Sequence, residues 1–338
     1  MLLEPNLLNK VKELQNNVFY QNKLYSFDKE QIIVIETEIN DIISEKPFGI
    51  DINTLKLLKS LKMATNVEYD EIRQTLIVDL ASENGKLRKF KAKTIKSELP
   101  NITNAQFENE ETEIDYARLL IAKKFVSAQI VKPMLTAVAV LRNGNLYATN
   151  AYKFYCYELN GTTKESDIAL LPVLFIDSLD STQEKIKINF NENFIYTAQE
   201  NRKIYSRQIS GASNYPLKAL DMIVNGSCLG YLKFNNDEIR ENIAIAKNVG
   251  FLDGNMDNKV IFNNGTLSVK GFNDFESEIE NGENIDYFFA LSLTNAKEMF
   301  DFAQDQEIKY SGDKKPLMFQ IKSEKAIETY IYSPVIAN

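Results

Sequence analysis

The sequence contains no histidine and only two cysteines. Histidine is the commonest general base and the commonest zinc ligand, so its absence excludes Ser-His and Cys-His nucleophiles and most zinc sites. Cys156 and Cys228 lie far apart without CxxC spacing, which favours two reduced, buried thiols over a disulfide or a metal role. Carboxylate catalysis on magnesium stays open, but the chain has no P-loop, no GxGxxG after a strand and no DxD-like cluster. We therefore expect no enzymatic activity, no cofactor and no metal.

Long apolar runs are also absent. No stretch approaches the roughly 18 to 20 apolar residues that cross a bilayer, and Met1–Lys10 has none of the features of a signal peptide. These absences predict a cytoplasmic protein without a membrane partner. The 338 residues, of which 44% are hydrophobic and 25% charged, are enough for two or three folded domains. The net charge of −8 does not suggest nucleic-acid binding, although charge can still be segregated by face.

A threefold repeat organises the chain. Three amphipathic helices with one apolar face each are predicted, at Asn6–Asn16, Asp115–Ser127 and Asn236–Lys247. A second set falls between them, at Asn53–Lys62, Val173–Ser181 and Leu293–Ala303. Residues 235 to 237, and Asn53 or Thr54, are suitable helix N-caps. Equivalent helices recur at a period of roughly 110 to 120 residues, which indicates a duplicated structural unit.

Strand patterns complete each repeat. Short strands at Phe48–Ile52 and Tyr287–Leu291 precede two helices of the second set. After the helices of this set, hydrophobic and polar residues alternate at Val67–Leu80, Ile186–Ala198 and Ile308–Ile321. Asn-Gly dipeptides at residues 84, 143 and 264 favour tight hairpins. The prediction is an α+β protein of three repeated domains, each with two helices packed on antiparallel sheets, at residues 1–108, 109–224 and 225–338.

Motifs in the second and third repeats resemble a known family. Phe125, Pro133, Leu135 and Val138 match the start of a motif, and Ala148–Phe154 stands where the family has Ala-Thr-Asp-Gly-His-Arg-Leu. Three further segments match it more loosely, at residues 214–216, 289–300 and 329–338. The whole pattern resembles the bacterial DNA polymerase III β sliding clamp. Asn150 and Ala151 replace Asp-Gly, Tyr152 replaces His, and residues 333–335 read Ser-Pro-Val instead of Met-Pro-Met, which fits a divergent, for example phage-encoded, member.

The resemblance implies a replicative polymerase processivity factor that encircles duplex DNA. A three-domain subunit would close a ring as a head-to-tail homodimer, with sheet edges near Val67–Leu80 and Ile261–Phe272 as candidate interfaces. Helices would line the ring, where phosphates require basic residues. The six predicted helical segments carry a net charge of +2, against −10 for the remainder. The candidate DNA-binding residues are Lys10, Lys12, Lys23, Lys56, Lys59, Lys62, Arg118, Lys123, Lys124, Arg240, Lys247 and Lys297.

The resemblance also implies a pocket between the second and third domains that captures short peptide motifs of DNA polymerase and a clamp loader. Its candidate residues are Leu135, Thr149, Ala151, Tyr152, Lys153, Phe154, Ile223, Ile331, Ser333 and Val335. Three alternatives remain. A clamp of two-domain subunits is disfavoured by length and by the third repeat. A non-catalytic, repeat-built structural protein such as a virion component would need neither basic helices nor a pocket. A carboxylate-dependent metal hydrolase is the third.

Overall fold

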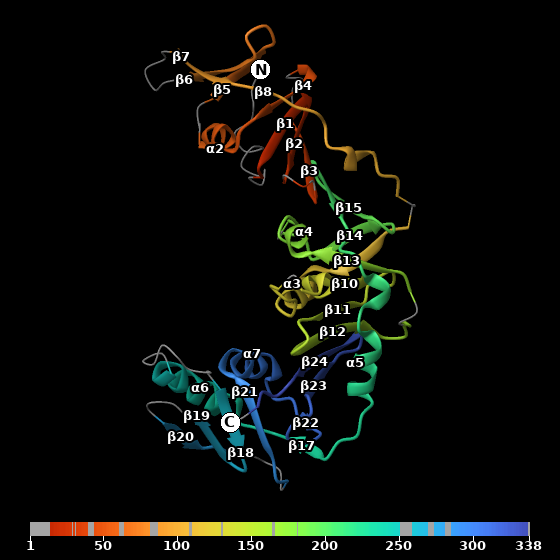
Figure 1. Ribbon diagram of the computed structural model, residues 1–338, viewed down its shortest axis with the longest axis vertical. Coiled ribbons are helices and arrows are strands. Elements are labelled where there is room, and N and C mark those ends of the chain that lie inside the picture. Colours follow the sequence, from red (N-terminus) through yellow and green to blue (C-terminus); the bar gives the residue numbers. More distant parts are fainter. Residues whose placement is uncertain are drawn as a thin grey trace. The chain divides into compact units, whose positions relative to one another are not determined.

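The computed structural model describes residues 14–28, 30, 32–39, 44–60, 64–81, 87–107, 110–129, 131–163, 166–180, 182–250, 259–269, 274–280 and 285–336. The chain forms two compact units. The first comprises residues 1–117 and 169–210, and the second comprises residues 118–168 and 211–338. Each unit is built around antiparallel sheets, drawn in Figure 1.

The first unit contains a nine-stranded sheet in the order β8-β4-β1-β2-β3-β16-β15-β14-β9. Its strands are β1 (Asn16–Gln21), β2 (Lys23–Phe27), β3 (Ile33–Glu38), β4 (Ser44–Ile50), β8 (Ile95–Lys96), β9 (Thr112–Asp115), β14 (Lys185–Phe190), β15 (Phe194–Gln199) and β16 (Arg202–Arg207). The antiparallel pairing of β3 with β16 joins residues 33–37 to residues 202–206. The expected first and second domains therefore share one sheet.

A second layer of the first unit holds α2 (Ile52–Ser60) and a three-stranded sheet, β5 (Ala64–Asp70), β6 (Thr75–Ala81) and β7 (Leu87–Lys93). Leu55 and Leu58 of α2 pack with Phe19 and Phe48 in one core. The short helices η1 (Asn101–Asn104) and α4 (Val173–Ile176) also belong to this unit.

The second unit contains a sheet in which β10-β11-β12-β24-β23-β22-β17 are successive neighbours. These strands are β10 (Ala137–Leu141), β11 (Leu146–Thr149), β12 (Lys153–Leu159), β17 (Gly230–Leu232), β22 (Ile308–Tyr310), β23 (Leu317–Lys322) and β24 (Ala326–Tyr332). β13 (Ile168–Pro172) spans the sequence boundary between the units. A four-stranded sheet has the order β20-β19-β18-β21, with β18 (Lys259–Asn263), β19 (Thr266–Val269), β20 (Phe275–Glu278) and β21 (Phe288–Ser292).

Helices of the second unit are α5 (Leu217–Val224), α6 (Asn236–Gly250) and α7 (Leu293–Ala303), with the short η2 (Pro133–Thr136) and η3 (Ala212–Asn214). α3 (Tyr116–Lys123) begins at the unit boundary. The pairing of β12 with β24 runs from Lys153 opposite Tyr332 to Leu159 opposite Ala326. It joins segments of the expected second and third domains, just as β3 and β16 join the first and second.

A buried carboxylate stabilises the β12–β24 pairing. Glu328 is 6% exposed and accepts hydrogen bonds from the hydroxyls of Tyr155 at 3.1 Å and Tyr330 at 2.9 Å. Arg118 of α3 lies 2.9 Å from the same carboxylate. The charge is therefore buried with partners, as a charge in a protein interior requires.

The α+β class with antiparallel sheets is confirmed. Four predicted helices are confirmed as α2, α3, α6 and α7, and α7 has the predicted bounds. The prediction over 173–181 was too long, because α4 ends at Ile176. The prediction over 6–16 falls mainly outside the described residues, and its end was wrong, because β1 begins at Asn16. Helix α5 was not predicted.

The strand and turn predictions had mixed outcomes. The alternations over 67–80, 186–198 and 308–321 each form two strands. The dipeptides Asn143-Gly144 and Asn264-Gly265 form the predicted hairpin turns, the second with φ of 39° and 85°. The dipeptide at residue 84 lies outside the described residues. Cys156 is buried as expected, whereas Cys228 is partly exposed, and both are free thiols.

Two helix starts differ in their capping. Asn235 caps α6 as expected, since its side-chain Oδ1 accepts from the backbone N–H of Glu238 at 3.4 Å. The expected cap of α2 by Asn53 or Thr54 was wrong. Asp51 accepts from the Thr54 hydroxyl at 2.6 Å and from the backbone N–H groups of Thr54 and Asn53, at 3.0 and 2.8 Å. These bonds, that from the Thr54 hydroxyl first, hold the pKa of the Asp51 carboxyl below its usual value.

The three-domain division at residues 108/109 and 224/225 stays a prediction. Both compact units contain part of the expected middle domain, because each of its sheets continues into a neighbouring segment. The interface prediction near Ile261–Phe272 also stays a prediction. β18 and β19, which cover residues 261–269, lie inside their sheet, and its edges are β20 and β21.

Candidate nucleic-acid and peptide interfaces

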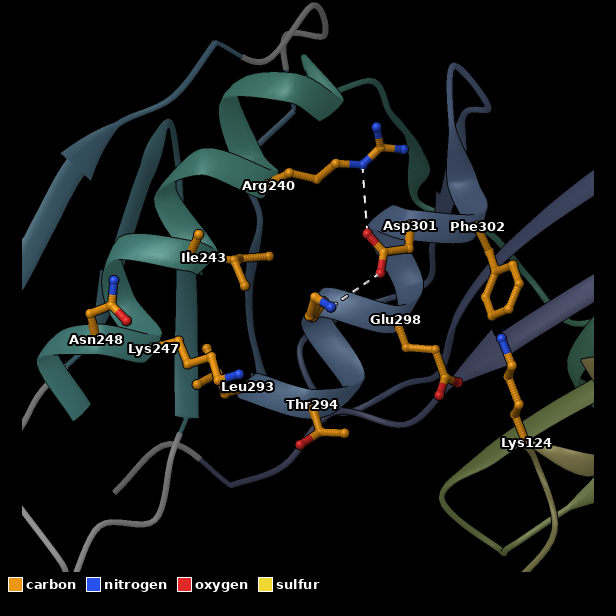
Figure 2. Close-up of a pocket in the computed structure, with 12 residues that line it drawn as sticks. Lys124, Arg240, Ile243, Lys247, Asn248, Leu293, Thr294, Glu298, Asp301 and Phe302 are labelled. Carbon is orange, nitrogen blue, oxygen red and sulfur yellow. Dashed lines mark ion pairs between the residues drawn. The ribbon is translucent and has the colours of Figure 1, made fainter. Parts of the chain in front are cut away.

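A groove of about 670 Å³ lies along α6 and α7 of the second unit (Figure 2). Its basic residues come from three elements and are Lys124, Arg240, Lys247 and Lys297. Its acidic residues, Glu298 and Asp301, both lie on α7. The groove therefore has an excess of positive charge, which favours an anion.

Ion pairs use part of this charge for packing. Asp301 lies 3.8 Å from Arg240 and 3.8 Å from Lys297. Figure 2 marks the ion pair between Asp301 and Arg240 with a dashed line. Arg240 Nη2 also donates to the Phe300 carbonyl oxygen at 3.0 Å. Arg240 of α6 therefore makes contacts with α7 and also lines the groove. Lys247 and Lys297 have exposed side chains, so they are the better placed of these residues to contact a ligand.

Lys124 follows α3 and completes one side of the groove. Its ammonium lies 5.4 Å from the centre of the Phe302 ring, a cation–π distance. Phe302 stacks in turn on Tyr330, with ring centres 5.1 Å apart. The aromatic core beneath α7 therefore positions a groove lysine.

The other predicted DNA-binding residues do not all join this groove. Lys56 and Lys59 lie on α2 of the first unit. Lys23 lies on strand β2 and pairs with Glu36 at 2.9 Å, mainly through a hydrogen bond that raises the lysine pKa. Arg118 pairs with the buried Glu328. Lys123 ends α3, and the three remaining candidates, Lys10, Lys12 and Lys62, lie outside the described residues.

The predicted peptide-binding residues centre on the loop between β11 and β12. Thr149 Oγ1 donates to the Lys153 carbonyl oxygen at 2.8 Å and accepts from Ala151 N at 3.0 Å. Asn150 Oδ1 accepts from the backbone N–H groups of Tyr152 and Lys153, at 3.0 and 2.9 Å. Ala151 has a φ of 76°, a left-handed conformation that favours glycine. The turn is thus held by its own side chains and leaves Tyr152 67% exposed.

The C-terminal segment lies against this loop. Ser333 N donates to the Tyr152 carbonyl oxygen at 2.7 Å, and Val335 N donates to the Ala290 carbonyl oxygen at 2.8 Å. Phe154 and Ile331 are buried cross-strand partners. The structure therefore brings the predicted loop and tail residues together. Leu135, in η2, and Ile223, on α5, come from other elements.

Sequence reasoning missed Glu298, which is central to this region. Lys153 Nζ lies 2.8 and 2.7 Å from the two Glu298 carboxylate oxygens. Tyr332 also donates to Glu298, at 3.1 Å, and burial, followed by the nearby Glu298 charge, raises the pKa of that phenol. Because the lysine and the glutamate are 145 residues apart, no local pattern could have found the pair.

The described residues contain no group of three or more His, Cys, Asp or Glu side chains that could hold a metal ion. Within the same residues, no helix is both long enough and apolar enough to cross a membrane.

Comparison with known proteins identifies the fold. No protein-family model matches the chain, and no curated protein matches it. Solved structures match along the whole chain. The DNA polymerase sliding clamp of Bacillus subtilis is 16% identical, with 99% of this chain and 98% of that chain covered and a TM-score of 0.77. The β subunit from the DNA polymerase of Streptococcus pyogenes is 14% identical, with 99% of each chain covered and a TM-score of 0.75.

A third match is more distant in sequence but as close in shape. The DNA polymerase sliding clamp of Caulobacter crescentus is 12% identical, with 98% of this chain and 97% of that chain covered and a TM-score of 0.77. The chain therefore has the fold of the bacterial DNA polymerase III β sliding clamps, as the sequence motifs predicted. At these identities it is a divergent example of that fold.

Proposed function

We propose that this protein is a DNA sliding clamp, a processivity factor without catalytic activity that acts in the cytoplasm. The observation that carries the proposal is the match to sliding clamps over 98 to 99% of this chain and 97 to 98% of those chains. A whole-chain match of this kind favours a clamp over a repeat-built structural protein.

The groove along α6 and α7 supports a contact with the phosphates of duplex DNA. Exposed lysines such as Lys247 and Lys297 can meet phosphates without reading base sequence. A small number of such contacts gives weak binding. Because salt screens these contacts, the affinity decreases as the salt concentration rises. Weak and sequence-independent contact is what movement along DNA requires.

Ring closure would follow from pairing two copies head to tail. In the first unit, β5 and β7 are the edges of the three-stranded sheet, and in the second unit β20 is an edge of the four-stranded sheet. Exposed edges carry unpaired backbone groups that can pair with another chain. We expect such an edge of one copy to meet an edge of its partner, which would give a dimer of 38.7 kDa subunits.

The loop around Tyr152 and the segment around Ser333 support capture of short peptides. We propose that DNA polymerase and a clamp loader bind here through apolar anchors such as leucine or phenylalanine. The exposed Tyr152 ring offers apolar contact area, and the hydrogen-bonded loop is rigid before the peptide arrives.

The proposal is tested by topology. Light scattering during chromatography should give twice the 38.7 kDa subunit mass at all working concentrations. Protein bound to nicked circular DNA should stay on the circle in high salt and leave when the circle is cut once. Retention that is the same on circular and linear DNA would contradict the clamp function.

A matched pair of variants tests the groove. The double variant K247A/K297A removes two groove lysines, and K314A/K315A removes two exposed lysines outside it. The first should lower the slope of log affinity against log salt by about 2, and the second should leave the slope unchanged. Equal effects of the two variants would show that the groove has no special part in DNA binding.

A further inference from the structure

Lys153 is the one basic residue among the ten predicted peptide-binding residues. It would be the natural partner of an acidic side chain in a captured peptide. However, its side chain is 8% exposed, and its ammonium lies within 2.8 Å of both Glu298 oxygens. The ammonium also lies 4.7 Å from the centre of the Phe125 ring. These contacts hold the ammonium inside the folded chain.

Glu298 is fixed in turn by its surroundings. Tyr332, opposite Lys153 in the β12–β24 pairing, donates to Glu298 Oε1 at 3.1 Å. Figure 2 shows Asp301 turned towards Arg240, whereas Glu298 points away from both. The two carboxylates of α7 therefore have separate partners, and Glu298 does not share the groove's ion pairs.

Releasing Lys153 would break a largely buried ion pair and leave the Glu298 charge uncompensated, which is costly. The binding free energy of a peptide carboxylate would have to offset that cost and also the cost of desolvating the carboxylate itself. The neighbouring loop residues offer no other cation, since residues 149–152 read Thr-Asn-Ala-Tyr.

We propose that Glu298 determines the specificity of the peptide-binding surface by holding Lys153 away from the peptide. The surface then selects partners by apolar anchors and is indifferent to acidic residues beside them. This inference rests on the proposed peptide-binding function. Glu298 acts through Lys153 and is a positioning residue.

The test compares two synthetic peptides of equal length with the same leucine and phenylalanine anchors. One peptide has aspartates beside the anchors, and the other has asparagines there. Fluorescence anisotropy gives their affinities for the full-length wild-type protein, for E298Q and for the matched control D301N. D301N removes a carboxylate from the same helix that pairs with Arg240 and Lys297 instead of Lys153.

Wild-type protein and D301N should bind both peptides within about threefold of each other. E298Q should bind the aspartate peptide about tenfold more tightly than the asparagine peptide, because a hydrogen bond to a charged group contributes at least that much. The double variant K153Q/E298Q should lose this preference. A purely structural role for Glu298 would weaken both peptides equally.

Four results would overturn the inference. The first is an aspartate preference of tenfold or more in the wild-type protein, and the second is no preference in folded E298Q. The third applies if E298Q does not fold: K153Q should leave the wild-type ratio of affinities unchanged, and a lowered ratio overturns the inference. The fourth is no binding of either peptide to any variant, which overturns the peptide-binding function as well. Retention on circular DNA is measured separately, so the clamp proposal can survive that last result.

Discussion

Five of the tyrosines buried in the second unit predict how the protein unfolds in alkali. They are Tyr147, Tyr155, Tyr215, Tyr330 and Tyr332, each at most 6% exposed. Burial is the main cause that raises the pKa of every one of them far above the ordinary value of 10.0. The folded state therefore keeps these phenols protonated at a pH where the unfolded chain would ionise.

The sign and size of the effect follow from linkage. Below about pH 10 both states hold the phenol proton, so the tyrosines add no pH dependence. Above that pH the unfolded state loses protons that the folded state retains, so the free energy of unfolding falls. At about pH 11 each tyrosine contributes a loss of about 1.4 kcal/mol, and five together about 7 kcal/mol. Since domains are stable by roughly 5–15 kcal/mol, the second unit should unfold near that pH.

Phenolate absorbance and far-UV circular dichroism measure this transition together. The chain has no tryptophan, so phenolate absorbance reports on tyrosines alone. The buried set should ionise in one cooperative step together with the loss of ellipticity. Gradual ionisation of all 16 tyrosines with unchanged ellipticity would refute the reasoning.

The variant Y215F separates tyrosine ionisation from that of the lysines. The Tyr215 hydroxyl donates to the Tyr147 carbonyl oxygen at 3.2 Å, so its loss should cost about 1 kcal/mol at neutral pH. Because the variant has one titrating phenol fewer, the difference should vanish at about pH 11. Urea unfolding of both proteins across this range is the measurement, and a constant difference would contradict the assignment.

Three further substitutions test single contacts by urea unfolding. Glu328→Gln removes the charge that Arg118 and two tyrosine hydroxyls contact and should cost about 2–3 kcal/mol, so a cost under about 0.5 kcal/mol would show that the charge is unimportant. Asp51→Ala removes the cap of α2 and should cost about 1 kcal/mol, whereas Asn53→Ala should be nearly neutral. Ala151→Gly relieves a φ of 76° and should stabilise by about 0.5 kcal/mol after the added chain entropy, with a destabilisation as the contrary result.

Local structure followed from the sequence wherever the signal itself is local. The apolar spacing of α6 and α7 gave both helices, and Asn264-Gly265 gave its hairpin, because these patterns involve residues within one or two turns of the chain. Helix α5 was missed although Leu217, Leu220 and Val224 have helical spacing. The cap of α2 was misplaced by two residues, an ordinary error in the boundary of a helix.

The sequence by itself determined the class of fold, the positions of most helices and turns, and the motifs shared with sliding clamps. Only the tertiary structure decided which charged residues remain available for binding. Lys153 and Arg118 were predicted from the sequence to be binding residues. In the structure Lys153 pairs with Glu298, 145 residues away, and Arg118 pairs with Glu328. Ion pairs of this kind form because the β12–β24 pairing brings distant segments together. No local propensity specifies such a partner. Only the tertiary structure therefore determines which carboxylate pairs with each of these basic residues.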